Sequence, residues 1–331
     1  MSEGRRRPAT GRYGGNVSTV PLPNRLVVLA SFDPDGEIAP HLRRHIEAWH
    51  GECRRLIVVS TSSLTEEARA WLSANSELVE RENYGYDFYS YRVGLLAAGD
   101  LSGYDEVVVC NDTFVGPLRP YAEIFAGMAK SAVDFWGMTR SRRVQPHVQS
   151  FFMVFRHWVA TSRAFGAFWQ EMEPVSDRRQ VIHRYEVGLS QRLLAAGFTM
   201  GSFFTESPGE RKLARARVAW WVLHRQGGRD AGLRRLFEQS REAWNPMYAL
   251  ADAAVHGDRL PLVKLELIRF DPYGLGTAHL LESCARVHPA EFEGVAEYLG
   301  RTAGSYPPRP GERLRSTPRG LGVLRPLVAY R

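Results

Sequence analysis

The chain has 331 residues, 44% of them hydrophobic, and a formal net charge of +7. This length and composition predict a globular protein of one large domain or two. No stretch approaches the ~20 consecutive apolar residues that span a bilayer, and the first twenty residues lack the apolar centre of a signal peptide, so we expect a cytoplasmic protein. Cys53, Cys110 and Cys284 lie far apart without CxxC spacing, which fits a reducing compartment and argues against zinc.

Arginine supplies almost all of the positive charge, because the chain has only three lysines, at 130, 212 and 264. Much of the excess lies in residues 1–24, which we predict to be a disordered basic head, and in the Pro/Arg/Gly-rich tail, residues 301–331. Basic ends can bind nucleic acid or anionic lipid, or merely keep a protein in solution. Neither zinc-finger spacing nor an RNP-type aromatic run is present, so we predict no nucleic-acid partner.

Strands and helices alternate through the first half of the chain. Short apolar runs rich in β-branched residues predict buried strands, and the stretches between them carry apolar residues at helical spacing. Asp87 stands where it could cap a helix that runs to Leu96, and Ser63-Leu64-Thr65-Glu66 has the pattern of a capping box. The alternation predicts a mostly parallel sheet with right-handed crossovers. The predicted strands span residues 25–31, 56–60, 78–81, 105–110, 132–138 and 147–155.

Helices are predicted over residues 157–172 and 186–196, and the second of them ends at Gly197. We place the end of the α/β domain at residue 205, so that this domain spans residues 25–205. From 206 to 300 the periodicity is helical, which predicts a helical C-terminal region.

Several common site motifs are missing from the sequence. It contains no GxxxxGK loop, no GxGxxG after the first strand, no HExxH and no GxSxG. These absences argue against kinase, dehydrogenase, zinc-protease and α/β-hydrolase functions.

The strand through Val107-Val108-Val109 stops abruptly at Asn111-Asp112-Thr113. Ligands of open α/β sheets bind at the carboxyl ends of strands, where residues 81–87 and 147–150 are also expected. A donor with a diphosphate needs its charge neutralised as the leaving group departs, and a hard divalent cation on carboxylate oxygens does this. Asp112 is the candidate ligand, with a purely structural turn as the alternative.

These segments together resemble a known family. The stretches ENYGYDFYSYRVGL, YDEVVVCNDTFVGPL, DFWGM and HVQSFFMVF are similar to the rhamnan synthesis protein F family of bacterial glycosyltransferases. The likeness extends through Asn245-Pro246 and residues 262–266, and so covers about residues 25–270.

The resemblance implies a GT-A-like nucleotide-sugar-binding domain and transfer of rhamnose or a related deoxysugar. The donor is then a nucleotide sugar such as dTDP-rhamnose, and the acceptor a growing glycan, lipid-linked in one version of the hypothesis. GT-A enzymes carry Asp-x-Asp at this strand end, where the last carboxylate meets the metal. Here the motif is Cys110-Asn111-Asp112, without the first carboxylate, although Asn-Asp-Ser/Thr is what the family itself shows.

The candidate site follows from these positions. Asp112 is predicted to bind the donor diphosphate through Mg²⁺ or Mn²⁺, and Asn111 to coordinate through its carbonyl oxygen or to bond the donor ribose. Asn83, Gly85 and Asp87 are predicted to line the nucleotide end. The alternatives are a simple turn for Asn83 and Gly85 and a simple helix cap for Asp87.

His147 and Gln149 are expected beside the donor, unless they merely alternate outward from a strand. Inverting sugar transfer needs a general base, and Glu186 at a helix start is our candidate, with Asp177 and Glu173 as rivals.

The stretch from Arg211 to Gln226 mixes aromatic and basic residues, which suits an anionic membrane surface or, alternatively, core packing. The sequence thus favours a glycosyltransferase. A protein that binds a sugar nucleotide or glycan without catalysis is the alternative.

Overall fold

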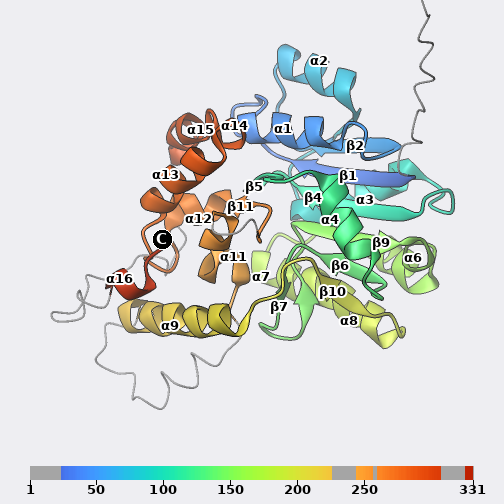
Figure 1. Ribbon diagram of the computed structural model, residues 1–331. Coiled ribbons are helices and arrows are strands. Elements are labelled where there is room, and N and C mark those ends of the chain that lie inside the picture. Colours follow the sequence, from blue (N-terminus) through green and yellow to red (C-terminus); the bar gives the residue numbers. More distant parts are fainter. Residues whose placement is uncertain (1–23, 226–243, 256–258, 307–324, 331) are drawn as a thin grey trace, which may run out of the picture.

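The computed structural model describes residues 24–225, 244–255, 259–306 and 325–330. Within them, a seven-stranded sheet in the order β10-β6-β9-β4-β1-β2-β3 forms the centre of the molecule (Figure 1). Neighbouring strands are parallel except β9, which runs antiparallel to both β4 and β6. The strands are β1 (Arg25–Ser31), β2 (Arg55–Ser60), β3 (Glu77–Glu80), β4 (Glu106–Asn111), β6 (Phe135–Gly137), β9 (Phe152–Arg156) and β10 (Met200–Ser202).

Apolar layers cover both faces of this sheet. In β4 the side chains of Val108 and Cys110 belong to one hydrophobic cluster, and those of Val107 and Val109 to the other. One face carries α1 (Pro40–Trp49), α2 (Glu66–Asn75) and α4 (Tyr121–Ala129). The other carries α3 (Tyr86–Ala98), α5 (His157–Ala160), α6 (Arg163–Gln170), α7 (Arg178–Val181), the π-helical η1 (Ile182–Val187) and α8 (Gly188–Ala195). This arrangement confirms the predicted mostly parallel, GT-A-like α/β class.

Helices dominate the chain after β10, as predicted. This region also contributes β11 (Val263–Lys264), which pairs antiparallel with β5 (Phe114–Val115), just beyond the end of β4. A second short ladder joins β7 (Arg140–Ser141) and β8 (His147–Val148). The helices are α9 (Pro208–Arg225), α11 (Pro246–Ala249), η2 (Ala251–Ala254), α12 (Leu265–Phe270), α13 (Thr277–Val287), α14 (Pro289–Phe292), α15 (Val295–Arg301), η3 (Ala303–Ser305) and α16 (Arg325–Val328).

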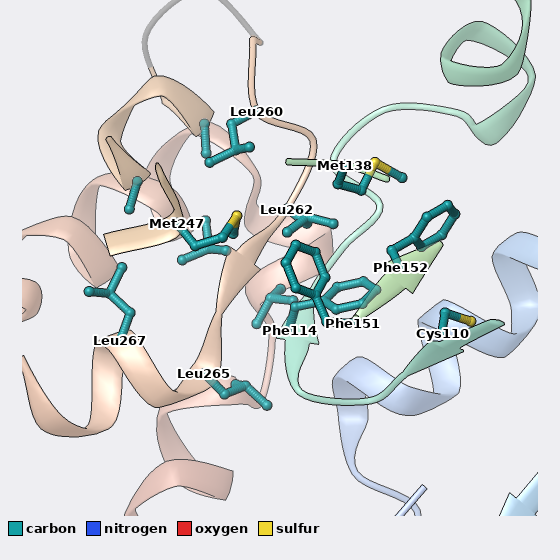
Figure 2. Packing of buried hydrophobic residues seen from close by; sticks show 14 of the residues in the cluster. Cys110, Phe114, Met138, Phe151, Phe152, Met247, Leu260, Leu262, Leu265 and Leu267 are labelled. Carbon is teal, nitrogen blue, oxygen red and sulfur yellow. The ribbon is translucent and has the colours of Figure 1, made fainter. Parts of the chain in front are cut away.

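One hydrophobic cluster joins the sheet to the helical region. Figure 2 shows Leu262 and Met247 on the side of the C-terminal region facing Phe114 and Phe151. All four side chains are at most 3% exposed. The helical region therefore completes the core over one face of the sheet rather than packing as a separate unit.

Two predicted helix starts are wrong in detail. Asp87 does not cap α3, because Gly85 precedes the helix with a left-handed φ of 72° and Asp87 lies within the first turn. A Cβ atom at Gly85 would stand 2.7 Å from Cβ of Tyr89, so glycine is needed there. Thr65, not Ser63, caps α2, accepting a hydrogen bond from the Ala68 amide at 3.2 Å.

The end of the chain also differs from the disordered tail that we expected. Residues 325–328 form α16, and Val328 and Tyr330 are buried against the helical region. The remaining tail, residues 307–324 and 331, lies outside the described residues, as do residues 1–23 of the predicted head.

Arg217 on α9 holds this terminal segment. Its guanidinium is fully buried, donates to both carboxylate oxygens of Asp252 at 2.8 and 2.6 Å, and also donates to the carbonyls of Ala249, Val328 and Ala329. Ala214, Val218 and Trp220 on the same helix are buried too. Core packing therefore accounts for most of the described part of the Arg211–Gln226 stretch; Gln226 and the side chains after Trp221 lie outside it.

We expect Arg217→Met to lower the free energy of unfolding by about 3–5 kcal/mol, because it leaves the Asp252 carboxylate buried without its cation. Urea denaturation would measure this loss. Arg69→Met, which breaks the exposed pair with Glu80, is the matched control and should cost much less. Equal losses in the two variants would contradict the role given to Arg217.

Candidate functional site

Polar side chains gather where β4 ends. Asn111 is 2% exposed, and Asp112 and Thr113 are half-buried. The backbone still follows the sheet here, because the Asp112 amide donates to the Ala30 carbonyl of β1 at 3.2 Å. The polar residues that the sequence singled out therefore stand at the carboxyl edge of the sheet, where ligands of such folds bind.

A continuous chain of hydrogen bonds runs along one side of this strand end. Nδ2 of Asn111 donates to Oδ2 of Asp87 at 2.6 Å, and Oγ1 of Thr113 donates to Oδ1 of Asn111 at 2.7 Å. Nζ of Lys264, on β11, donates in turn to Oγ1 of Thr113. Asp87 and Asn111 are thus brought together as predicted, but Thr113 and Lys264 complete a group that sequence reasoning missed. Lys264 does lie in the segment 262–266 that contributed to the family resemblance.

Burial governs the charges along this chain. It raises the pKa of Asp87 above its ordinary value, against the opposing hydrogen bond from Asn111 and the charge of Lys264. It also lowers the pKa of Lys264 to about 8, although the charges of Glu266, Asp87 and Glu186 oppose this. Asp87 and Lys264 therefore lie in a poorly solvated place, where their electrostatic interaction with a charged ligand would be strong.

Asp112 lies apart from that chain and turns toward the end of β1. Its Oδ2 accepts a hydrogen bond from the Phe32 amide at 2.8 Å. Burial raises the pKa of Asp112 to about 7, and the charges of Asp87 and Asp33 add to the shift. Asp33 is buried as well. Its Oδ1 accepts from the amides of Asp35 and Glu37, whereas its Oδ2 has no hydrogen-bond partner among the residues that the structure describes.

His147 and Glu186 form a second polar group. Nε2 of His147 lies 3.2 Å from Oε1 of Glu186, and Oγ of Ser150 donates to the other carboxylate oxygen at 2.8 Å. Burial alone would lower the pKa of His147, but the hydrogen bond and charge of Glu186, with the Gln145 carbonyl, outweigh it and raise that pKa. A histidine and a hydroxyl thus orient one carboxylate, an arrangement suited to moving a proton.

Glu186 is not at a helix start, so that prediction is wrong. It lies inside η1, in the middle of the continuous helical segment α7-η1-α8. The helix starts earlier because the Asp177 side chain caps it, accepting from the Gln180 amide at 2.9 Å. Asp177 and the other rival base, Glu173, are both exposed. A π-helical turn is a local departure that often marks functional positions.

The remaining predicted residues have mixed placements. Asn83 is exposed, in a loop that Arg81 holds by donating to the carbonyls of Glu82, Tyr84 and Tyr86. Gln149 is buried and accepts a hydrogen bond from Oγ1 of Thr139 at 2.6 Å, which gives it a structural role. His147 is buried too, so neither side chain alternates outward to solvent as one reading of the strand suggested.

Metal-ligating residues are sparse in the described ranges. No group of three or more His, Cys, Asp and Glu side chains is placed to hold a metal ion by itself there. A cation at Asp112 would need oxygen ligands from elsewhere, such as phosphate and water. In the same described ranges no helix is both long enough and apolar enough to cross a membrane.

Sequence comparison links the chain to a family and to two named relatives. The model of the family described as rhamnan synthesis protein F matches residues 56–220. Uncharacterized protein y4gN of Sinorhizobium fredii is 27% identical over 210 residues, covering 60% of this chain and 55% of the relative. Virulence protein VirA of Vibrio anguillarum is 30% identical over 116 residues, covering 34% and 36%. The chain thus matches only part of the length of either relative.

Solved structures give distant matches. A nucleotide-diphospho-sugar transferase from Desulfovibrio desulfuricans is 10% identical with a TM-score of 0.36, covering 65% of this chain and 94% of that one. Glucosyl-3-phosphoglycerate synthase from Mycobacterium tuberculosis, in complex with Mn²⁺ and UDP, is 15% identical with a TM-score of 0.27, covering 40% and 57%. Similarity at this level carries no argument about function.

The raised pKa of His147 predicts a pH-dependent contribution to stability. It is fully present below the ordinary histidine pKa and is lost as pH rises through the higher folded-state pKa. We therefore expect His147→Gln to destabilise the protein more at about pH 5.5 than at about pH 8.5, by on the order of 1 kcal/mol. Urea unfolding at both pH values would measure this. The exposed His279 supplies the control, His279→Gln, and a pH-independent effect of His147→Gln would contradict the pairing with Glu186.

Proposed function

Because this chain belongs, over residues 56–220, to the rhamnan synthesis protein F family, we propose that it is a glycosyltransferase. It moves a deoxyhexose, rhamnose being the first candidate, from a nucleotide-sugar donor to a growing bacterial polysaccharide or another glycan. The observation that carries this proposal is the presence of two polar groups, one around Asn111 and Asp87 and one around Glu186, close enough for the charge of Glu186 to raise the pKa of Asp87. Transfer from a panel of nucleotide sugars that includes dTDP-rhamnose is the direct test.

The donor binds at the carboxyl edge of the sheet. Its nucleotide lies toward the loop of Asn83 and Gly85, and its diphosphate toward Asn111 and Asp112. The N-terminus of α3 supports the place of the diphosphate, because the first turn of a helix favours anions and Asp87 of this turn contacts Asn111.

Glu186 accepts the proton of the acceptor hydroxyl. The Ser150 hydroxyl and His147 hold its two carboxylate oxygens at 2.8 and 3.2 Å, so that the carboxylate is oriented before the acceptor arrives. Its side chain is 17% exposed, which leaves it open to a substrate. As the hydroxyl oxygen bonds to the anomeric carbon, the bond from that carbon to the donor phosphate breaks, and the nucleoside diphosphate leaves with the electron pair.

Asp112 and Asp33 would hold a divalent cation. They fit one, because within the described ranges Oδ2 of Asp33 is a buried oxygen without a hydrogen-bond partner, and the charge of Asp33 raises the pKa of Asp112. When bound, Mg²⁺ or Mn²⁺ would neutralise the donor phosphates, which complete its coordination together with water. With two carboxylates alone, metal affinity should be weak until the donor is present.

The protein works in the cytoplasm, and a lipid-linked acceptor would bring it to the inner face of the membrane. The exposed Arg211, Lys212 and Arg215 of α9 support an electrostatic contact, whereas Ala214, Val218 and Trp220 of this helix are buried. The alternative is a protein that binds sugar nucleotides without catalysis. It is supported by Cys110, which stands where the Asp-x-Asp motif has its first carboxylate. Donor that binds but is neither hydrolysed nor transferred would favour this alternative.

We expect Glu186→Gln to lower kcat by about 10²- to 10⁴-fold with little change in donor affinity, because a general base acts in the transition state. Steady-state kinetics and calorimetry would separate the two quantities. Glu173→Gln is the matched control, since Glu173 is a rival carboxylate that is exposed. If Glu173→Gln is the variant that loses turnover, the assignment of Glu186 is wrong.

We also expect Asp112→Asn to weaken donor binding by about tenfold or more in Mg²⁺, but to have little effect in EDTA, because the loss acts through the cation. Calorimetry of both proteins in both conditions gives the comparison. Asp100→Asn, in an exposed turn, serves as the control. Wild-type activity that survives EDTA unchanged would exclude a metal role for Asp112.

A further inference from the structure

Lys264 reaches the strand end from a distant part of the chain. It is on β11, whose two residues pair with Val115 and Phe114 of β5. The next amide, that of Leu265, donates to the Thr113 carbonyl at 3.1 Å. Backbone bonds therefore fix this lysine beside Thr113, one residue beyond Asp112.

The ammonium group of Lys264 is fixed by one hydrogen bond but still has donors for a ligand. Its one hydrogen bond within the described ranges goes to Oγ1 of Thr113, and it lies 4.3 Å from the centre of the Phe151 ring. An ammonium can donate three hydrogen bonds, so capacity remains for a ligand. The side chain is half-buried, and lysine is seldom buried without a partner.

Lys264 is a cation in direct contact with the strand end, through the hydroxyl of Thr113. Arg178, the other positive group that faces it, lies 3.6 Å from Glu266, and its side chain is 46% exposed. Glu266, Asp87 and Glu186 add negative charge around the ammonium. A donor diphosphate brings more negative charge to this place, so binding requires a cation that is fixed in position and incompletely neutralised.

We propose that Lys264 binds the donor diphosphate and stabilises the nucleoside diphosphate as it leaves, an inference that rests on the proposed function. The acceptor hydroxyl oxygen forms the new bond to the anomeric carbon, and its proton goes to Glu186. The bond from the anomeric carbon to the phosphate oxygen breaks and leaves its electron pair on that oxygen. Lys264 stays protonated and donates a hydrogen bond to it. The chain through Thr113 and Asn111 to Asp87 orients the ammonium for this contact.

The test compares ligands with and without phosphates. Wild type, Lys264→Met, Lys264→Gln and Lys264→Arg are titrated with dTDP and UDP and with the nucleosides thymidine and uridine, and transfer is assayed with the nucleotide sugars. We expect Lys264→Met and Lys264→Gln to bind the preferred nucleoside diphosphate about 10- to 100-fold more weakly and the nucleoside equally well. Lys264→Arg should recover part of the affinity. Lys130→Met, which removes an exposed lysine just after α4, is the control.

The outcomes separate the two proposals. Nucleoside and nucleoside diphosphate affinities that fall together would show that Lys264 only maintains the fold. If wild type binds and transfers while both neutral variants keep full diphosphate affinity, the role of Lys264 is overturned and the glycosyltransferase stands. If wild type binds neither diphosphate and transfers no sugar, the proposed function fails, and this inference fails with it. Should Lys264→Met not fold, Lys264→Gln and Lys264→Arg still decide the matter.

Discussion

The pairing of β5 with β11 is the constraint on which the candidate site depends. Only two residues of each strand take part, yet this ladder fixes Lys264 against a strand end that is 151 residues away from it in sequence. Closing so long a loop costs entropy, and the apolar contacts of Leu262 and Leu265 with the cluster around Phe114 offset that cost. The helical C-terminal region is therefore part of the candidate site, because without it the strand end would carry Asn111 and Thr113 but not the ammonium group of Lys264.

Burial gives this polar group its chemical character. Polar atoms at a poorly solvated strand end must be paired. Here three successive hydrogen bonds pair the side chains of Asp87, Asn111, Thr113 and Lys264. Such a group is ordered before any ligand arrives, so little reorganisation accompanies binding. Among the described residues, Oδ2 of Asp33 is a buried oxygen without a hydrogen-bond partner, and so departs from this pairing. An unsatisfied buried carboxylate oxygen costs stability, which is why we connect it with a ligand rather than with the fold.

Local sequence patterns predicted the sheet and the polar strand end, because both follow from short-range features such as the Val107-Val108-Val109 run. These patterns gave wrong or incomplete predictions where a non-local contact, or the backbone conformation of a single residue, determines the structure. The left-handed Gly85 places Asp87 inside its helix rather than at the cap, which frees its carboxylate to accept from Asn111. The Asp177 cap starts a helix earlier than the periodicity indicated and so leaves Glu186 in its middle. Hydrophobic periodicity could not predict the contact between Lys264 and Thr113, since that contact depends on the topology of the whole fold.

The missing first carboxylate of the Asp-x-Asp pattern has a packing explanation. Cys110 is fully buried in the same cluster as Trp49, and its sulfur lies 3.9 Å from Nε2 of His45. Burial lowers the pKa of His45 to about 3, so that ring is neutral and would not balance a charge at position 110. A carboxylate there would lose its hydration without gaining a cation, which costs several kcal/mol. The thiol, whose pKa burial raises, is therefore a core residue of β4. A second carboxylate for the cation proposed at Asp112 is offered by Asp33, just after β1, whose buried Oδ2 has no hydrogen-bond partner among the described residues.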